Sequence, residues 1–211
     1  MSADGFTRVL LVRHGETDWN AALRIQGHTD ISLNARGRWQ AARLAEALAD
    51  EELHAVYSSD LRRAHDTAHP AASAAGAAVR FDSGLRERGF GVFEGLTFAE
   101  IEERWPDDAR RWRRREPGYA PGGGESLTDF YARCVAAAAQ LALRHRGQSI
   151  LIVSHGGVLD CLYRAATGAA LDAARTWQLG NAAVNRLLHT EAGFTLVGWD
   201  DQRHLSVDPA R

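Results

Sequence analysis

The stretch Val9-Leu10-Leu11-Val12 is a short apolar run that ends abruptly in Arg13-His14-Gly15-Glu16-Thr17. A second run, Ile150-Leu151-Ile152-Val153, ends just as abruptly in Ser154-His155-Gly156-Gly157. Short continuous apolar runs are typical of strands buried on both faces of a parallel sheet. Ligands bind where the chain leaves the carboxyl ends of such strands. The two runs therefore predict one crevice that holds two imidazoles and an arginine, a site for an anion and a nucleophile.

The composition limits what this chain can do. Its 211 residues are 45% hydrophobic, enough for a core, and its formal net charge of -2 gives no reason to expect nucleic acid or an anionic membrane as partner. All 25 basic residues are arginines, which excludes a Schiff-base lysine and a P-loop lysine. No apolar run is long enough to span a membrane.

Cysteine usage and the N-terminus indicate a reducing compartment. Cys134 and Cys161 lie in apolar, helix-like segments, and two cysteines are too few for a disulfide framework. We expect both to be buried thiols. The start Met1-Ser2-Ala3-Asp4-Gly5 shows no signal peptide. These observations favour a cytoplasmic protein.

Strands and helices alternate along the chain, which predicts an α/β fold. We expect a single domain over residues 1–211: a three-layer sandwich with a mostly parallel mixed sheet flanked by helices. Further strands are predicted at 55–57 and 79–81, with an edge hairpin at 183–189 and 193–199. Helices are predicted at 34–49, from about residue 60, at 97–115 and at 125–146. Ser58 and Ser59 are expected to cap the second of these helices and Ser126 the last, while the tail after Leu205 is expected to be disordered.

Residues 90–124 interrupt the alternation. This segment contains a highly charged helical stretch and a breaker-rich loop from Pro117 to Gly124. We interpret it as a small helical lid insertion over the crevice, with a solvated pair of surface helices as the alternative. Its aromatic side chains would give the lid an apolar wall; they are Phe90, Phe93, Phe98, Trp105 and Trp112.

Four motifs in order give the chain a family resemblance. They are Arg13-His14-Gly15-Glu16-Thr17-Asp18-Trp19-Asn20, Ser58-Ser59-Asp60-Leu61-Arg62-Arg63-Ala64, Leu85-Arg86-Glu87 and Ser154-His155-Gly156-Gly157. Together they resemble the histidine phosphatase superfamily, the phosphoglycerate mutase-like enzymes, over about residues 8 to 199. The resemblance implies a phosphatase that needs no metal or other cofactor. It would hydrolyse a small phosphate monoester through a phosphohistidine intermediate.

Residue chemistry agrees with the roles that the resemblance implies. His14 is the candidate nucleophile, because an imidazole is nucleophilic and largely neutral near pH 7. Arg13 and Arg63 can grip phosphoryl oxygens with planar forks, and His155 can donate to one. The family register selects Arg63, and its neighbour Arg62 is the alternative. Glu87 is the candidate general acid and base.

The remaining candidates depend on the family alignment or stay open. Asn20, Gln26, Gly27 and Gly156 are expected to line the phosphate pocket, and Thr17 to donate a hydrogen bond there. Glu16 is expected to orient an arginine, and it is also the alternative acid. A divalent metal bound by His14, His155 and the two glutamates is a remote alternative that would make the chain a metal-binding module, but the adjacent arginine would repel a cation.

A cofactor-dependent phosphoglycerate mutase is the main alternative function. Mutases of this family carry a longer insertion with a lysine and an arginine pair, and His-Tyr soon after the acidic residue. Here Glu87 is followed by Arg88-Gly89-Phe90, lysine is absent, and only Trp112-Arg113-Arg114 resembles the arginine pair. The sequence therefore favours a phosphatase. Its substrate among small monoesters stays open, as does assembly into a homodimer.

Overall fold

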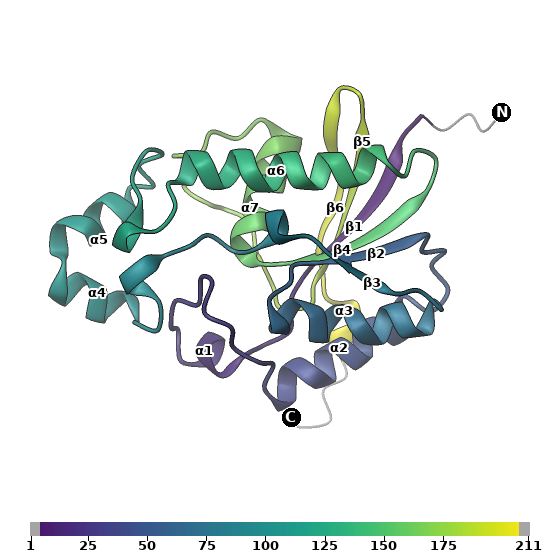
Figure 1. The fold of residues 1–211 in the computed structure, drawn as a ribbon, viewed down its shortest axis with the longest axis horizontal. Helices are drawn as coiled ribbons and strands as arrows, with labels where there is room; N and C mark the ends of the chain where they lie inside the picture. The colour runs from purple at the N-terminus through teal and green to yellow at the C-terminus, as the bar shows by residue number, and fades with distance from the viewer. Residues whose placement is uncertain (1–4, 207–211) are drawn as a thin grey trace.

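The computed structural model describes residues 5–206, so the expected disorder of the last residues lies largely outside the described part. A six-stranded sheet in the order β3-β2-β4-β1-β5-β6 forms its centre (Figure 1). The first four strands in this order are parallel; β5 is antiparallel to β1, and β6 is antiparallel to β5. The predicted mostly parallel mixed sheet and its edge hairpin are confirmed.

The elements alternate as the sequence predicts. The strands are β1 Thr7–Arg13, β2 Ala55–Ser58, β3 Val79–Phe81, β4 Ser149–Ser154, β5 Val184–Thr190 and β6 Gly193–Asp201. The helices are α1 Asp18–Ala21, α2 Ala35–Ala47, α3 Arg62–Ala74, α4 Phe98–Arg104, α5 Pro106–Arg113, α6 Leu127–Leu143 and α7 Gly156–Thr167. Short 3₁₀ turns lie at Ser83–Leu85, Gly91–Phe93, Pro121–Gly123 and Arg203–Leu205.

The two central strands are buried on both faces. In β1, Val9 and Leu11 pack with α6 and α7, while Leu10 and Val12 pack toward α2 and α3. The residues of β4 alternate in the same way. Figure 1 shows these two helix pairs on opposite sides of the sheet. Side chains of successive strand residues point to opposite faces, so a continuous apolar run fits a strand covered by helices twice. The three-layer sandwich is confirmed.

The register of the central strands brings the two histidine motifs together. Arg13, the last residue of β1, pairs with Ser154, the last residue of β4. His14 and His155 therefore leave the sheet at the same edge, with ring centroids 5.2 Å apart. Cys134 and Cys161 lie in the core between α6 and α7, both free and fully buried, as expected.

Two expectations about helix ends are corrected. Ser58 and Ser59 do not cap α3: the capping position is Leu61, whose side chain makes no capping bond. Instead Asp30 accepts a hydrogen bond from the Arg62 amide at 2.7 Å. The stretch 97–115 is not one helix, because Pro106 has no N–H to continue a helix and begins a new one. Ser126 does cap α6, accepting from the Asp129 amide at 3.1 Å.

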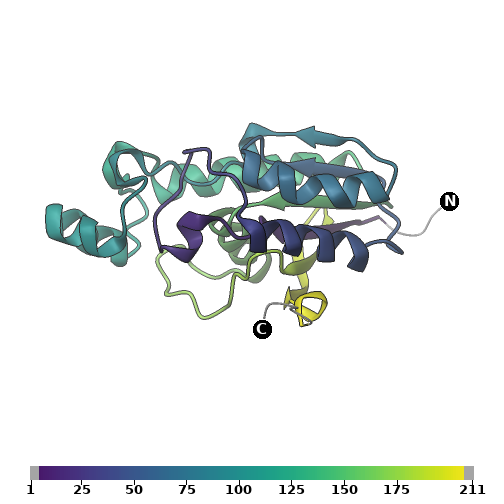
Figure 2. The ribbon, with the colours of Figure 1, turned by 90° about the horizontal axis from the view of Figure 1, so that it is seen from below.

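The predicted insertion projects beyond one end of the sheet. Figures 1 and 2 both show α4 and α5 beside the layered body rather than on a face of the sheet. A small apolar cluster holds these helices together, with Phe93, Ile101 and Ala109 at its centre. Phe98, Trp105 and Trp112 pack against this cluster, so much of the aromatic surface serves the insertion's own core. The insertion lies at the end of the sheet where the histidines emerge.

Candidate functional site

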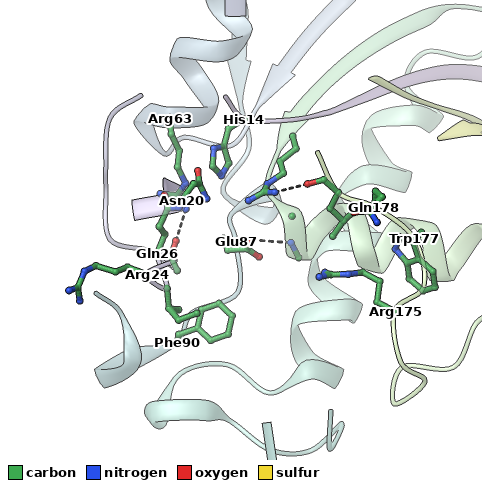
Figure 3. Close-up of a pocket in the computed structure, with 16 residues that line it drawn as sticks. His14, Asn20, Arg24, Gln26, Arg63, Glu87, Phe90, Arg175, Trp177 and Gln178 are labelled. Atoms are coloured by element: carbon green, nitrogen blue, oxygen red, sulfur yellow. Dashed lines mark hydrogen bonds between the residues drawn. The ribbon is translucent and has the colours of Figure 1, made fainter. Parts of the chain in front are cut away.

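A cavity of about 360 Å³ opens at the carboxyl ends of β1 and β4. Its wall includes most of the residues expected from the sequence: Arg13, His14, Asn20, Gln26, Gly27, Arg63, Glu87 and Gly156. Figure 3 shows His14 and Arg63 on one side and Glu87 near the centre. The structure thus brings together residues from β1, α3, the 86–90 loop and the start of α7.

His14 is held as a neutral, oriented imidazole. Its side chain is only 3% exposed, and its Nδ1 lies 2.7 Å from the Gly15 carbonyl oxygen. A carbonyl accepts only, so Nδ1 carries the proton and Nε2 keeps its lone pair. Burial, with the charges of Arg63 and Arg13, lowers the pKa of His14 well below its ordinary value. The imidazole is therefore unprotonated at Nε2 near neutral pH.

Two arginines beside His14 provide a fixed positive field. Arg63 is fully buried, and its Nη1 and Nη2 donate to the carbonyls of Thr29 and Gly27 at 2.9 and 2.8 Å. Burial lowers the pKa of Arg63 to about 10, so it stays charged at neutral pH. Arg13 donates from Nη1 to the Leu179 carbonyl at 2.5 Å. The neighbouring Arg62 is exposed and faces Asp66, so the structure places Arg63, not Arg62, in the cavity.

Unpartnered nitrogens gather around His14. In residues 5–206 the buried side-chain atoms without a hydrogen-bond partner include Arg13 Nε, Arg63 Nε and His155 Nδ1. Buried donors normally find acceptors, and exceptions call for an explanation. An oxyanion bound beside His14 would supply acceptors for such donors.

His155 lies behind the cavity wall rather than in it. It is fully buried, and its Nε2 is 2.8 Å from the Ser59 hydroxyl. When that hydroxyl donates to Nε2, the proton of His155 resides on Nδ1, the unpartnered nitrogen. Burial, followed by the charge of Arg63, lowers the pKa of His155 well below its ordinary value. In this tautomer His155 is a neutral imidazole that can donate from Nδ1.

Glu87 reaches the cavity from the loop after the turn Ser83–Leu85. Its Oε1 accepts from its neighbour's amide, Arg88 N–H, at 2.9 Å, and its Oε2 from the Gly157 N–H at 3.0 Å. A Cβ on residue 157 would lie 2.1 Å from Glu87 Oε1, so only glycine leaves room for the carboxylate. Neither adjacent arginine pairs with it: Arg86 binds Asp60, and Arg88 binds two carbonyls. The carboxyl group is thus fixed by backbone amides.

Thr17 and Glu16 support the site instead of lining it. The Thr17 hydroxyl caps α1 and lies 3.0 Å from both Asn20 Oδ1 and Gln26 Oε1, the two acceptors available to its one proton. It is fully buried and is not part of the cavity wall, so the structure gives it a role in holding those two amides. Glu16 accepts from Asn34 Nδ2 at 2.9 Å and also lies outside the wall. Of the two candidate acids, only Glu87 faces the cavity.

The wall residues that carry no signal in the sequence include Arg24, Arg175, Trp177 and Gln178. The last three come from the loop between α7 and β5 (Figure 3). The Trp177 ring stacks on Tyr163 with centroids 3.9 Å apart, which places this loop against α7. No motif marks these residues, and only charge or aromatic character in a long loop could have indicated them.

The arginines expected to serve a mutase do not reach the cavity. Arg113 lies 3.2 Å from Glu102 and over the Phe98 ring, and Arg114 is exposed. Neither contributes to the cavity wall. Within residues 5–206, no group of three or more His, Cys, Asp or Glu side chains is arranged to hold a metal ion. Nor is any helix of this part long and apolar enough to cross a membrane.

Fold and cavity define an α/β enzyme with a cationic pocket built around a histidine. The sequence matches the histidine phosphatase superfamily (branch 1) over residues 9–202, and the chain belongs to that superfamily. It is 40% identical over 205 residues to phosphoglycerate mutase-like protein 4 of Arabidopsis thaliana, covering 95% of this chain and 87% of that protein.

Two further relatives match over most of their length. The metal-independent phosphoserine phosphatase of Arabidopsis thaliana is 39% identical over 203 residues, which cover 95% of this chain and 84% of that protein. The solved structure of Bacillus stearothermophilus YhfR superposes with a TM-score of 0.88 at 33% identity, covering 95% of this chain and 100% of that one. The predicted family membership and fold are therefore confirmed.

Proposed function

We propose that this protein is a metal-independent phosphatase that hydrolyses small phosphate monoesters through a phosphohistidine on His14. One observation carries the proposal: a neutral, oriented His14 is surrounded by unpartnered donors of Arg13, Arg63 and His155. A phosphoryl group carries negative charge over its equatorial oxygens, so catalysis depends on positioning and on fixed positive charge. The family and the related metal-independent phosphoserine phosphatase support the same chemistry.

In the first step, His14 Nε2 attacks phosphorus in line with the ester bond. The P–N bond forms, the P–O bond to the leaving group breaks, and the Glu87 carboxyl proton passes to the departing oxygen. The phosphorylated imidazole gains positive charge. The Gly15 carbonyl, 2.7 Å from Nδ1, stabilises that charge through the Nδ1–H bond.

In the second step, Glu87 acts as a base. Its carboxylate takes a proton from water, the water oxygen attacks phosphorus, and the P–N bond breaks with its electron pair returning to Nε2. Inorganic phosphate leaves, and Glu87 is again protonated. Because Arg88 and Gly157 hold both carboxylate oxygens, the same group can serve both steps from one position.

The mutase alternative has weaker support from the geometry. A mutase must keep its phosphohistidine from water until the acceptor returns, which requires a closed pocket with further cations. The insertion is short, and its Arg113 and Arg114 lie away from the cavity. Its third candidate cation, Arg115, lies in the wall of an adjoining cavity but is already paired with Asp160 and the Leu171 carbonyl. Water should therefore reach the phosphoenzyme.

A panel of monoesters tests the proposal directly. Phosphate release should be efficient from at least one small monoester and measurable from p-nitrophenyl phosphate. In a parallel reaction, 3-phosphoglycerate with catalytic 2,3-bisphosphoglycerate should yield little 2-phosphoglycerate. Isomerisation that outruns phosphate release about a hundredfold would establish the mutase instead, a difference of about 2.7 kcal/mol in barrier.

A further inference from the structure

A second cavity of about 300 Å³ adjoins the first beyond Glu87. The two cavities share Glu87, Phe90, Gly157 and Arg175 in their walls. The second is otherwise lined by Trp112, Leu127 and Phe130, with Arg88, Arg115 and Asp160. Glu87 is the proposed proton donor to the leaving oxygen, so a leaving group attached to that oxygen extends toward this second cavity.

Arg175 differs from the other arginines of the two walls. Arg88 and Arg115 are tied to main-chain carbonyls, and Arg115 also binds Asp160 at 2.7 Å. Arg24 binds the Gly95 carbonyl and lies 3.1 Å from Glu100. Within residues 5–206 the Arg175 guanidinium has neither an ion pair nor a hydrogen bond, and it points toward Glu87 in Figure 3. One cation at the boundary of the two cavities is thus available to a ligand.

The loop that carries Arg175 is held in place on both sides. Before it, the buried Arg164 donates from Nη2 to the Ala173 carbonyl at 3.0 Å, and Arg115 donates to the Leu171 carbonyl at 2.9 Å. After it, Trp177 stacks on Tyr163, with the Arg164 guanidinium 4.8 Å from the Trp177 ring centroid. These contacts on both sides of Arg175 fix its backbone, so its side chain can reach only a limited volume at the opening of the cavity.

The charges around Arg175 favour a singly charged anion. Asp160 is already shared by Arg115 and Arg164, and both oxygens of Glu87 accept from amides. Burial lowers the pKa of Arg13, and Arg175 contributes to the lowering. An anion at Arg175 would relieve this crowding of like charges. A planar guanidinium fork matches a carboxylate, and one unpaired cation balances one carboxylate but not a second phosphoryl dianion.

We propose that Arg175 is a specificity-determining residue that binds a carboxylate on the leaving group, so that the substrates are phosphate monoesters of hydroxy acids. The inference rests on the proposed phosphatase function. The phosphoryl group would lie among Arg13, Arg63 and His14, and the ester oxygen near Glu87. The carboxylate would lie at Arg175, with the rest of the leaving group against Phe90 and Phe130.

Phosphoserine and phosphoethanolamine test this assignment, because they differ only in the carboxylate. The wild type should prefer phosphoserine. In Arg175→Gln, the kcat/KM ratio of phosphoserine to phosphoethanolamine should fall on the order of 10- to 100-fold, the usual worth of a charged hydrogen bond. The loss should appear mainly as a higher KM for phosphoserine, because the carboxylate contact persists from the ground state into the transition state. Arg175→Lys should retain part of the preference.

Arg114→Gln is the matched control, since it removes one exposed arginine that lines neither cavity. It should leave the ratio unchanged. An unchanged ratio in Arg175→Gln would overturn the assignment, as would an equal fall in Arg114→Gln.

If the wild type turns over neither compound, 3-phosphoglycerate and glycerol 3-phosphate replace them. Failure on all four, with p-nitrophenyl phosphate still hydrolysed, would overturn the hydroxy-acid inference alone. Failure on p-nitrophenyl phosphate as well would overturn the phosphatase function.

Discussion

Replacing Glu87 by glutamine tests the assignment of the proton donor. The carboxylate now accepts two backbone N–H bonds, at 2.9 Å from Arg88 and 3.0 Å from Gly157. A glutamine has one acceptor oxygen, so one of these amides would face an NH₂ group and lose its bond. We expect the free energy of unfolding to fall by about 1–3 kcal/mol, the cost of one unsatisfied donor. Urea denaturation would measure this loss and show that the variant is folded.

The chemical effect should depend on the leaving group. An alkoxide is a poor leaving group and needs the proton, whereas p-nitrophenolate leaves readily without one. Loss of general acid catalysis should slow phosphoryl transfer from an alkyl monoester about 10²- to 10⁴-fold and from p-nitrophenyl phosphate much less. Rapid-quench single-turnover measurements are required, because Glu87 is also the proposed base that activates water in the second step.

Equal losses on the two substrates would refute this assignment. They would show that the variant disturbs the site as a whole, or that another group donates the proton. Glu16→Gln is the control, because Glu16 is the alternative acid and lies outside the cavity wall. Any loss of rate in Glu16→Gln, relative to the wild type, should be the same for both substrates.

Three further perturbations address the cations, the metal and the histidines. Arg63→Ala should lower the rate about 10²- to 10³-fold in steady-state assays, while replacement of the exposed Arg62 by alanine should lower it much less. The reverse ranking would show that Arg62, not Arg63, is the phosphate ligand. Dialysis against EDTA should leave turnover intact, and a loss restored by magnesium or zinc would contradict the mechanism. Burial, with the charges of Arg63 and Arg13, lowers the pKa of His14. Below about pH 6.5 the unfolded chain therefore binds a proton that the folded protein does not, and the free energy of unfolding decreases as the pH is lowered. His14→Gln should reduce the slope of unfolding free energy against pH near 5.5 by about one proton, or 1.4 kcal/mol per pH unit, in urea titrations, and an unchanged slope would show that His14 is not held neutral.

The central sheet and the edge that carries the two histidine motifs are predictable because their signals are local. The runs at 9–12 and 150–153 are apolar at every position, which is typical of strands covered on both faces, and the structure confirms them as such strands. The residues that follow such strands must share one edge of the sheet. The sequence alone therefore suffices to place His14 and His155 together.

Features that depend on the return of a distant loop are not predictable in this way. Arg175 lies in an irregular segment that reaches the cavity because two residues of α7 hold it. Arg164 donates to a carbonyl of this segment, and Tyr163 stacks on its Trp177. Thr17, which the sequence predicts to donate to the ligand, lies outside the cavity wall and caps α1, and composition cannot distinguish a hydroxyl that binds phosphate from one that caps a helix. Its bonds to Asn20 and Gln26 are evident only from the geometry.

The covalent intermediate proposed on His14 is tested most directly by trapping of acid-labile phosphate. The enzyme would be mixed with a rapidly hydrolysed monoester, quenched within a turnover, and analysed by intact mass and by peptide mapping under neutral to basic conditions. We predict one phosphoryl group on the peptide that contains His14, and none in His14→Ala. Labelling that persists in His14→Ala, or that maps to another residue, would contradict the account.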